Sequence, residues 1–128
     1  MKWMTRVAWV ALALLAGDLS GASPAEAFET GRDLAHACGD NLSSERVIGN
    51  ALCLGYIAGF VDAYRVSLGL LERHAPTVKP PICLPSHGVQ KGQVMGLVNE
   101  WLNRTPADHD QSARVVLWSV LSTAYPCS

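Results

Sequence analysis

The sequence predicts an all-α protein, a compact four-helix domain with an antiparallel, bundle-like arrangement and two disulfides. Three observations support this prediction. Apolar residues recur at steps of three and four along several segments, and no segment alternates with the period of two typical of a strand. Glycines and prolines separate these segments into pieces of helical length. The four cysteines all lie after residue 27, and their even number favours two disulfides.

Residues 28–38 predict a short first helix. Thr30 is its expected N-cap, with Asp33 three residues later as the second partner of the cap. The run Gly39-Asp40-Asn41 then ends the helix. Its predicted buried face consists of Leu34, Ala37 and Cys38.

Residues 45–74 predict the longest helix, which Ser43 or Ser44 could cap. At 1.5 Å per residue, this helix would be about 45 Å long. Gly55 and Gly59 are four residues apart and share one face, so we expect another part of the same domain to pack closely against them. The predicted buried face consists of Val47, Leu54, Ile57, Val61, Leu68 and Leu71.

Residues 75–89 predict a loop, because proline cannot continue a helix or occupy a central strand. The four prolines of this segment are Pro76, Pro80, Pro81 and Pro85. Cys83 lies inside the loop, and a disulfide there would hold the loop to the core.

Two further helices follow the loop. Residues 90–103 predict the third helix, which Thr105 and Pro106 end. Its apolar face consists of Val94, Leu97, Val98, Trp101 and Leu102. Asp108 and Gln111 have the spacing of a capping box, which predicts the start of the last helix. The buried face of that helix is predicted to consist of Ala113, Val116, Leu117, Val120, Leu121 and Ala124.

Residues 1–27 have the three parts of a cleavable signal peptide. Lys2 and Arg6 give a positive start, residues 7–16 are apolar, and Ala25-Glu26-Ala27 precedes a predicted cut after Ala27. The apolar run is shorter than the ~20 residues of a membrane-spanning helix. No further long apolar stretch is expected after the cut. We therefore predict that residues 28–128 form a domain that is released from the membrane, in the periplasm or outside the cell.

The cysteines are predicted to form disulfides and not a metal site. Zinc sites favour close pairs such as C-x-x-C, whereas Cys38, Cys53, Cys83 and Cys127 are far apart in the sequence. Four cysteines allow three pairings. In an up-and-down bundle, Cys38 and Cys53 lie toward one pole and Cys83 and Cys127 toward the other, which favours the pairs 38–53 and 83–127. The pair 53–83 stays possible, because the loop is long enough to reach back along the second helix.

The composition and the motifs exclude several classes of function. With 10 Lys and Arg against 11 Asp and Glu, the chain lacks the basic field of a nucleic-acid-binding protein. Its 128 residues are too few for a Rossmann or barrel enzyme, and no G-x-S-x-G, H-E-x-x-H or phosphate-binding loop occurs. We therefore predict a protein that is not an enzyme and needs no cofactor or metal.

Several single residues are candidates for a functional role. Asp62 lies in an apolar run but has no evident acid–base partner, so a surface or structural role is expected. Trp101 and Trp118 are expected to pack in the core and not to act as binding anchors. The histidines are expected at solvated helix ends or in loops: His36, His74, His87 and His109.

The order of motifs resembles the Rap/Tai immunity proteins of type VI secretion systems. The residues that carry the resemblance are Gly31 to Cys38, the stretch Cys53-Leu-Gly-Tyr-Ile-Ala-Gly-Phe-Val-Asp62, Cys83-Leu-Pro85, Trp101-Leu102 and the final Tyr125-Pro126-Cys127. The resemblance implies a periplasmic, all-helical protein that is often dimeric. It also implies a partner, a peptidoglycan-cleaving amidase effector, which the immunity protein blocks by filling its catalytic groove.

An element that fills a groove should protrude, which favours the segments Ala75–Ile82 and Arg104–Asp110. Two other functions are kept as alternatives. The first is a periplasmic stress chaperone of the HdeA type, or another non-enzymatic periplasmic binding protein. The second and weaker alternative is a small hydrolase.

Overall fold

The computed structural model describes residues 28–39 and 44–128. These residues form four α-helices and one short 3-10 helix, and they contain no β-strand, so the predicted all-α fold class is confirmed. The elements are α2 (Gly31–Ala37), α3 (Ser44–His74), α4 (Lys91–Arg104), η2 (Pro106–Asp110) and α5 (Ala113–Ala124). The predicted signal peptide and the possible cap Ser43 lie outside the described residues.

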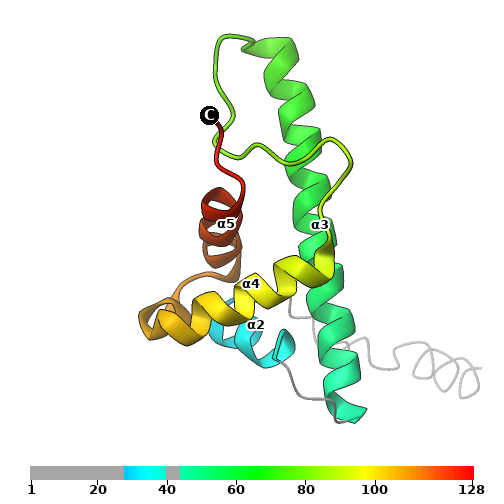
Figure 1. Ribbon diagram of the computed structural model, residues 1–128, viewed down its shortest axis with the longest axis vertical. Coiled ribbons are helices and arrows are strands. Elements are labelled where there is room, and N and C mark those ends of the chain that lie inside the picture. Colours follow the sequence, from blue (N-terminus) through cyan, green and yellow to red (C-terminus); the bar gives the residue numbers. More distant parts are fainter. Residues whose placement is uncertain (1–27, 40–43) are drawn as a thin grey trace, which may run out of the picture.

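Helix α3 runs along the whole length of the described domain, and the shorter helices pack beside it (Figure 1). Helices α2 and α4 both pack against α3, with α4 crossing it, and α5 packs against α2 and α4. The C-terminal end of α3 extends beyond α5, and the following loop turns back from this end toward the start of α4. The domain therefore has a packed end at α2 and a projecting end at the loop.

The core is formed by one face of each helix. Helix α3 contributes Cys53, Ile57, Val61 and Tyr64, which are at most 8% exposed. The predicted buried faces of the other helices are largely confirmed: Leu34, Ala37 and Cys38 in α2, Val94, Val98 and Leu102 in α4, and Ala113, Val116, Leu117, Val120 and Leu121 in α5. Ala124 was predicted to be buried but is exposed, because it lies in the last turn of α5, beyond the core.

The outward face of α3 is also apolar. Its large side chains remain half to two-thirds exposed: Ile48, Leu52, Val66 and Leu70. Val47, predicted to be buried, is 64% exposed. The close packing expected at Gly55 and Gly59 is wrong within the described domain, because no neighbouring atom lies within 4 Å of where a side chain would begin. These glycines face away from the core.

By length and hydropathy alone, residues Arg46–His74 of α3 would suffice to cross a membrane. The expectation that no further long apolar stretch follows residue 27 is therefore wrong. Only 22% of the most apolar 18-residue window is buried within the domain. Its buried part nevertheless supplies the core on which the shorter helices pack.

The start of α2 is bound to the segment that precedes α5. Thr30 and Asp33 form the predicted capping box. Thr30 also pairs with Ser112 in an isolated antiparallel bridge, in which Gly31 N donates to Gln111 O (2.8 Å) and Ala113 N donates to Glu29 O (2.9 Å). This bridge places residues far apart in the sequence side by side.

The predicted capping box at Asp108 and Gln111 is wrong. Residues Pro106–Asp110 form the 3-10 helix η2, and α5 begins only at Ala113. The Asp108 carboxylate is occupied elsewhere, because it accepts a hydrogen bond from the indole Nε1 of Trp101 at 2.7 Å. A side-chain contact between α4 and the adjacent η2 thus overrides the local capping pattern.

Glycines in two packing environments should respond oppositely to substitution by alanine. A Cβ added to Gly31 would lie 2.2 Å from the Asp108 carbonyl oxygen, so we expect Gly31→Ala to lower the free energy of unfolding by about 1–3 kcal/mol. Gly96 in α4 has no neighbour within 4 Å, so Gly96→Ala should raise it by up to about 1 kcal/mol. Urea unfolding of both variants tests this, and equal effects would contradict the close contact between α2 and η2.

Candidate partner-binding surface

Two disulfides join parts of the chain that the helices alone would leave separate. Cys38–Cys53 links the end of α2 to α3, and Cys83–Cys127 links the loop before α4 to the C-terminal tail. The pairing favoured from the sequence is therefore confirmed, and the alternative pair 53–83 is excluded. Cys38 and Cys53 are completely buried, whereas Cys83 is exposed.

The loop after α3 is anchored at both of its ends. At the first end, Ala75 N donates to Leu71 O (2.8 Å), which adds a turn to α3. At the second end, the buried Tyr64 hydroxyl donates to Ile82 O (2.8 Å) and accepts from Ile82 N (3.0 Å). Cys83 N donates to Tyr125 O (2.9 Å), next to the disulfide. The segment 75–81 is therefore fixed at both of its ends, by the end of α3 and by the contacts of Ile82 and Cys83.

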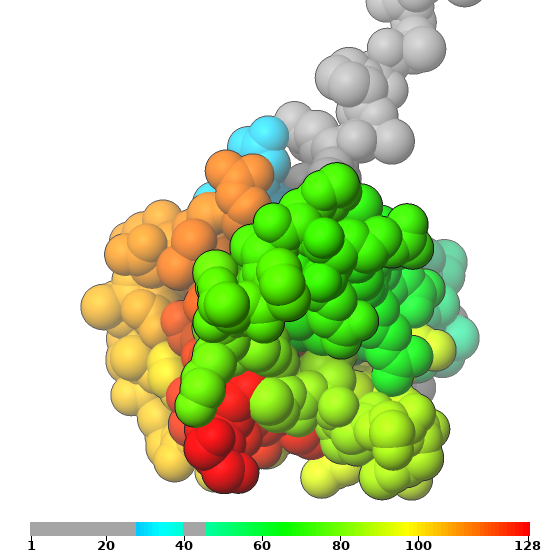
Figure 2. All heavy atoms as spheres, turned by 90° about the horizontal axis from the view of Figure 1, so that it is seen from above, coloured from blue at the N-terminus to red at the C-terminus, as the bar shows by residue number. Residues whose placement is uncertain are grey.

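Residues 75–81, which we call the projecting loop, form the outermost part of the molecule at this end (Figure 1). Val78 at its tip is 53% exposed, although it is apolar. The prolines Pro76, Pro80 and Pro81 restrict the backbone on both sides of the tip. Viewed from above, the end of α3, the projecting loop and the C-terminal tail form one continuous face (Figure 2).

The second segment that the sequence suggested as protruding, Arg104–Asp110, is packed. Besides the Trp101–Asp108 hydrogen bond, His109 Nε2 lies 3.1 Å from Leu102 O. Arg32 of α2 forms an ion pair with Asp110 at 2.7 Å. Three contacts to α2 and α4 hold this segment, so the projecting loop is the better candidate for entering a partner's groove.

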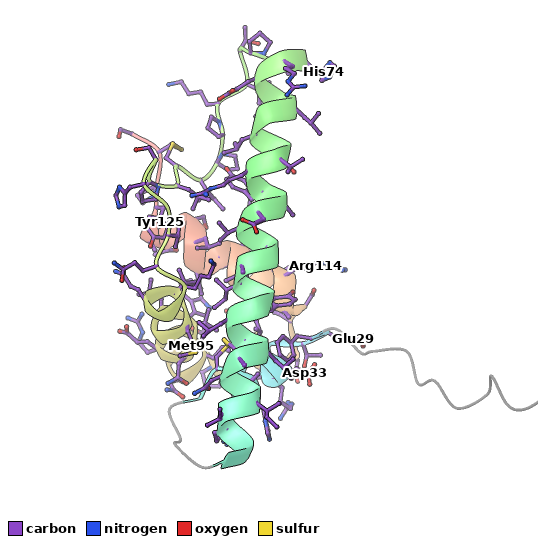
Figure 3. All side chains as sticks on the ribbon, turned by 90° about the vertical axis from the view of Figure 1, so that its right-hand side faces the viewer. Glu29, Asp33, His74, Met95, Arg114 and Tyr125 are labelled. Atoms are coloured by element: carbon purple, nitrogen blue, oxygen red, sulfur yellow. A yellow bond between two sulfur atoms is a disulfide. The ribbon has the colours of Figure 1, made fainter. Side chains whose placement is uncertain are left out.

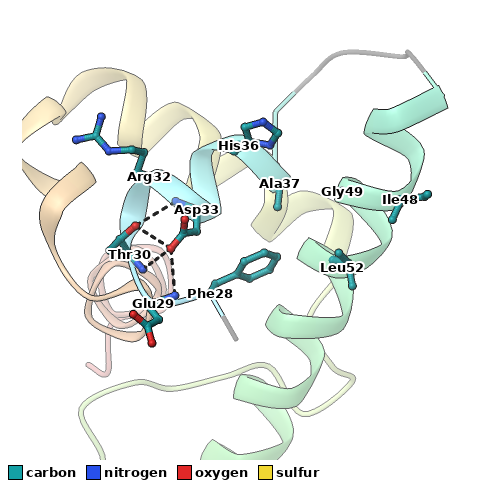
Figure 4. A pocket seen from close by; sticks show the side chains of 10 residues that line it. All are labelled: Phe28, Glu29, Thr30, Arg32, Asp33, His36, Ala37, Ile48, Gly49 and Leu52. Carbon is teal, nitrogen blue, oxygen red and sulfur yellow. Dashed lines mark hydrogen bonds between the residues drawn. The ribbon is translucent and has the colours of Figure 1, made fainter. Parts of the chain in front are cut away.

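A groove of about 740 Å³ lies beside α2 and the first part of α3 (Figure 4). Phe28, Ile48 and Leu52 give it an apolar side. Asp33 also lines the groove and is a candidate for acid–base chemistry there. The Asp33 carboxylate already accepts hydrogen bonds from Glu29 N, Thr30 N and Thr30 Oγ1 at 2.8–3.2 Å. The hydrogen bonds from the Thr30 backbone and side chain hold the pKa of Asp33 below its ordinary value. This carboxylate caps a helix and is not free for acid–base chemistry.

The other candidate residues are spread over the surface. The Asp62 side chain is exposed and forms no hydrogen bond or ion pair with another described residue, as the predicted surface role implies. Trp118 is 40% exposed and packs edge-on against Tyr64, with 5.9 Å between ring centroids, so it lies only partly in the core. His36, His74 and His87 are exposed. No group of three or more His, Cys, Asp or Glu side chains that could hold a metal occurs among the described residues.

These features define a small, disulfide-bonded helical domain whose described part offers a projecting loop and open helix faces to a partner. The family model of the Rap1a immunity proteins matches residues 30–127, nearly the whole described domain. The chain therefore belongs to the Rap1a immunity protein family, and the resemblance found in the sequence is confirmed. No curated protein and no solved structure matches the chain.

The contact between Tyr64 and Ile82 was not predicted from the sequence. The helical periodicity was a usable signal, because Tyr64 continues the buried series Ile57 and Val61 in α3. Its partner could not be found this way. Ile82 lies in a proline-rich loop, and the contact is made by its backbone, whose position depends on the whole fold.

Removing the Tyr64 hydroxyl should release the projecting loop from α3 at its second end. Tyr64→Phe leaves the buried N–H and C=O of Ile82 without their partner, so we expect a loss of about 1–3 kcal/mol in the free energy of unfolding. Amide hydrogen exchange should accelerate at residues 76–83 and stay unchanged in α2. Tyr125→Phe is the matched control, and equal acceleration in both variants would contradict the anchoring role of Tyr64.

Proposed function

We propose that this chain is an exported immunity protein, which binds a peptidoglycan amidase effector of a type VI secretion system and blocks its catalytic groove. Membership of the Rap1a immunity family is the observation that carries this proposal. Two disulfides suit an oxidising compartment, and residues 1–27 have the pattern of a cleavable leader, which supports a periplasmic location. Inhibition by occlusion requires no catalytic residue, cofactor or metal.

The projecting loop is the element that we propose to enter the amidase groove. It combines an exposed apolar tip at Val78 with anchors at both ends, so little conformational freedom would be lost when it binds. A flexible loop of the same length would bind more weakly, because binding would have to order its backbone at a cost in conformational entropy. The anchors at Tyr64 and Cys83 therefore support a role in tight inhibition.

The proposal predicts a cell-wall amidase gene beside the gene of this chain, and binding to that amidase, called the neighbouring amidase below, tests it directly. We expect a nanomolar Kd and loss of peptidoglycan cleavage in the presence of purified residues 28–128. Val78→Asp should weaken binding at least tenfold, or by about 1.4 kcal/mol or more, because it places a charge in an apolar contact. Calorimetry and a muropeptide-release assay provide the two measurements.

Val115→Asp is the matched control, since Val115 is 48% exposed on α5, away from the projecting loop. It should bind like the wild type. Absence of binding to the neighbouring amidase would refute the proposed function. Tight inhibition that Val78→Asp leaves intact would refute only the role of the loop.

We also propose that a second copy of the chain covers the outward face of α3. An antiparallel pairing centred on Gly59 would place Leu52 opposite Val66 of the second copy, and Ile48 opposite Leu70. Gly55 and Gly59 are open to solvent at the middle of this face and would let the two backbones approach. Such a pairing would remove from water the large apolar side chains on the outward face of α3.

Light scattering after gel filtration tests this homodimer. We expect the mass of two copies for the wild type and of one copy for Leu52→Glu, which would bury an unpaired charge. Val115→Glu on α5 serves as the control and should keep the mass of two copies. A wild type that stays monomeric at its highest soluble concentration would exclude the pairing.

A further inference from the structure

Unpaired positive charge is concentrated in one part of the described domain. From residue 63 to residue 99, the sequence contains a single acidic side chain, Glu72. The same stretch contains four basic side chains, Arg65, Arg73, Lys79 and Lys91, and all four are exposed. None of the four forms an ion pair with a described residue, since the ion pairs of the domain involve Arg32 and Arg104.

The opposite end carries charges of both signs, and most of its acidic side chains already have partners. Asp110 pairs with Arg32 and Glu100 with Arg104, while Asp108 accepts a hydrogen bond from Trp101 and Asp33 caps α2. Figure 3 labels Glu29 and Asp33 beside the N-terminal half of α3 and His74 at its C-terminal end, beside the projecting loop. The net charge of −1 for the whole chain therefore conceals an excess of unpaired positive charge toward the C-terminal part of α3 and the loop that follows it.

We infer that the loop end, defined as residues 65–91, is a cationic docking surface for an acidic protein surface. This inference rests on the proposed function and specifies the chemistry of the partner. Lys79 and Arg73 lie on either side of the tip of the projecting loop, so an acidic rim around a shallow apolar pocket would match both the cations and Val78. Cations without partners in the free domain lose no existing ion pair when they meet carboxylates.

The arrangement of these cations favours a protein over a lipid surface. An anionic membrane favours an amphipathic helix with many basic residues along one side. Here, only four Lys and Arg are spread over the end of α3, an anchored loop and the start of α4. The Arg65 side chain also extends toward the segment between the projecting loop and α4, because its guanidinium lies 3.7 Å from where a side chain at Gly88 would begin. This geometry suits a rigid, concave partner.

The first experiment measures the association rate with the neighbouring amidase at low and at physiological salt. Lys79→Glu and Arg73→Glu should each slow association about tenfold at low salt and flatten its salt dependence, with a smaller effect on dissociation. Arg114→Glu on α5 makes the same charge change elsewhere and should leave the rate near that of the wild type. Equal effects of all three variants, or of none, would overturn the inference.

The second experiment needs no amidase. In an NMR titration with a ten-residue glutamate peptide, we expect shifts confined to residues 65–91, which Lys79→Glu weakens. Shifts absent from this region, or equal at Arg32, Arg46, Arg104 and Arg114, would overturn the inference. If the amidase itself does not bind, the proposed function fails and the peptide titration alone decides. Binding to phosphatidylglycerol vesicles that Lys79→Glu abolishes would also overturn it, in favour of a lipid surface.

Discussion

The buried face of α3 is the interaction on which the rest of the domain depends. Helices α2, α4 and α5 have 7, 14 and 12 residues, and isolated helices of such lengths are marginal in water. Helices α2 and α4 pack their apolar faces against Cys53, Ile57 and Val61, which are almost completely buried, and α5 completes the same core by packing against α2 and α4. The Cys38–Cys53 disulfide ties the shortest of them covalently to this same face. Tyr64 extends the face to the loop, so the support for the core and for the projecting loop is continuous.

Features that depend on local patterns were predictable from the sequence. Periodicity gave the helices to within a few residues, because apolar steps of three and four reflect the geometry of a single helix. The pairing of the cysteines followed from which helix ends lie together. The errors arise where tertiary packing decides and a local pattern does not. Trp101 removes Asp108 from its expected cap, and the exposed face of α3 carries as many apolar residues as its buried face, so periodicity could not assign Val47.

The candidate site was less predictable than the fold. Two segments were equally good as protruding loops in the sequence, since both connect predicted helices and contain proline. Only the ion pair of Arg32 with Asp110 and the hydrogen bonds of Asp108 and His109 distinguish them, by packing one segment onto α2 and α4. The four unpaired cations were present in the sequence, but their grouping acquires meaning only when the C-terminal part of α3 and the projecting loop lie away from α2.

The two disulfides close consecutive rings, residues 38–53 and 83–127, which neither overlap nor interlock. The segment 54–82, with most of α3 and the projecting loop, belongs to neither ring. A change in the length of the projecting loop would therefore alter the size of neither ring, while Ile57, Val61 and Tyr64 of the same segment are fixed by the core. The covalent framework and the loop available for recognition thus occupy different parts of the chain, so one can vary while the other stays the same.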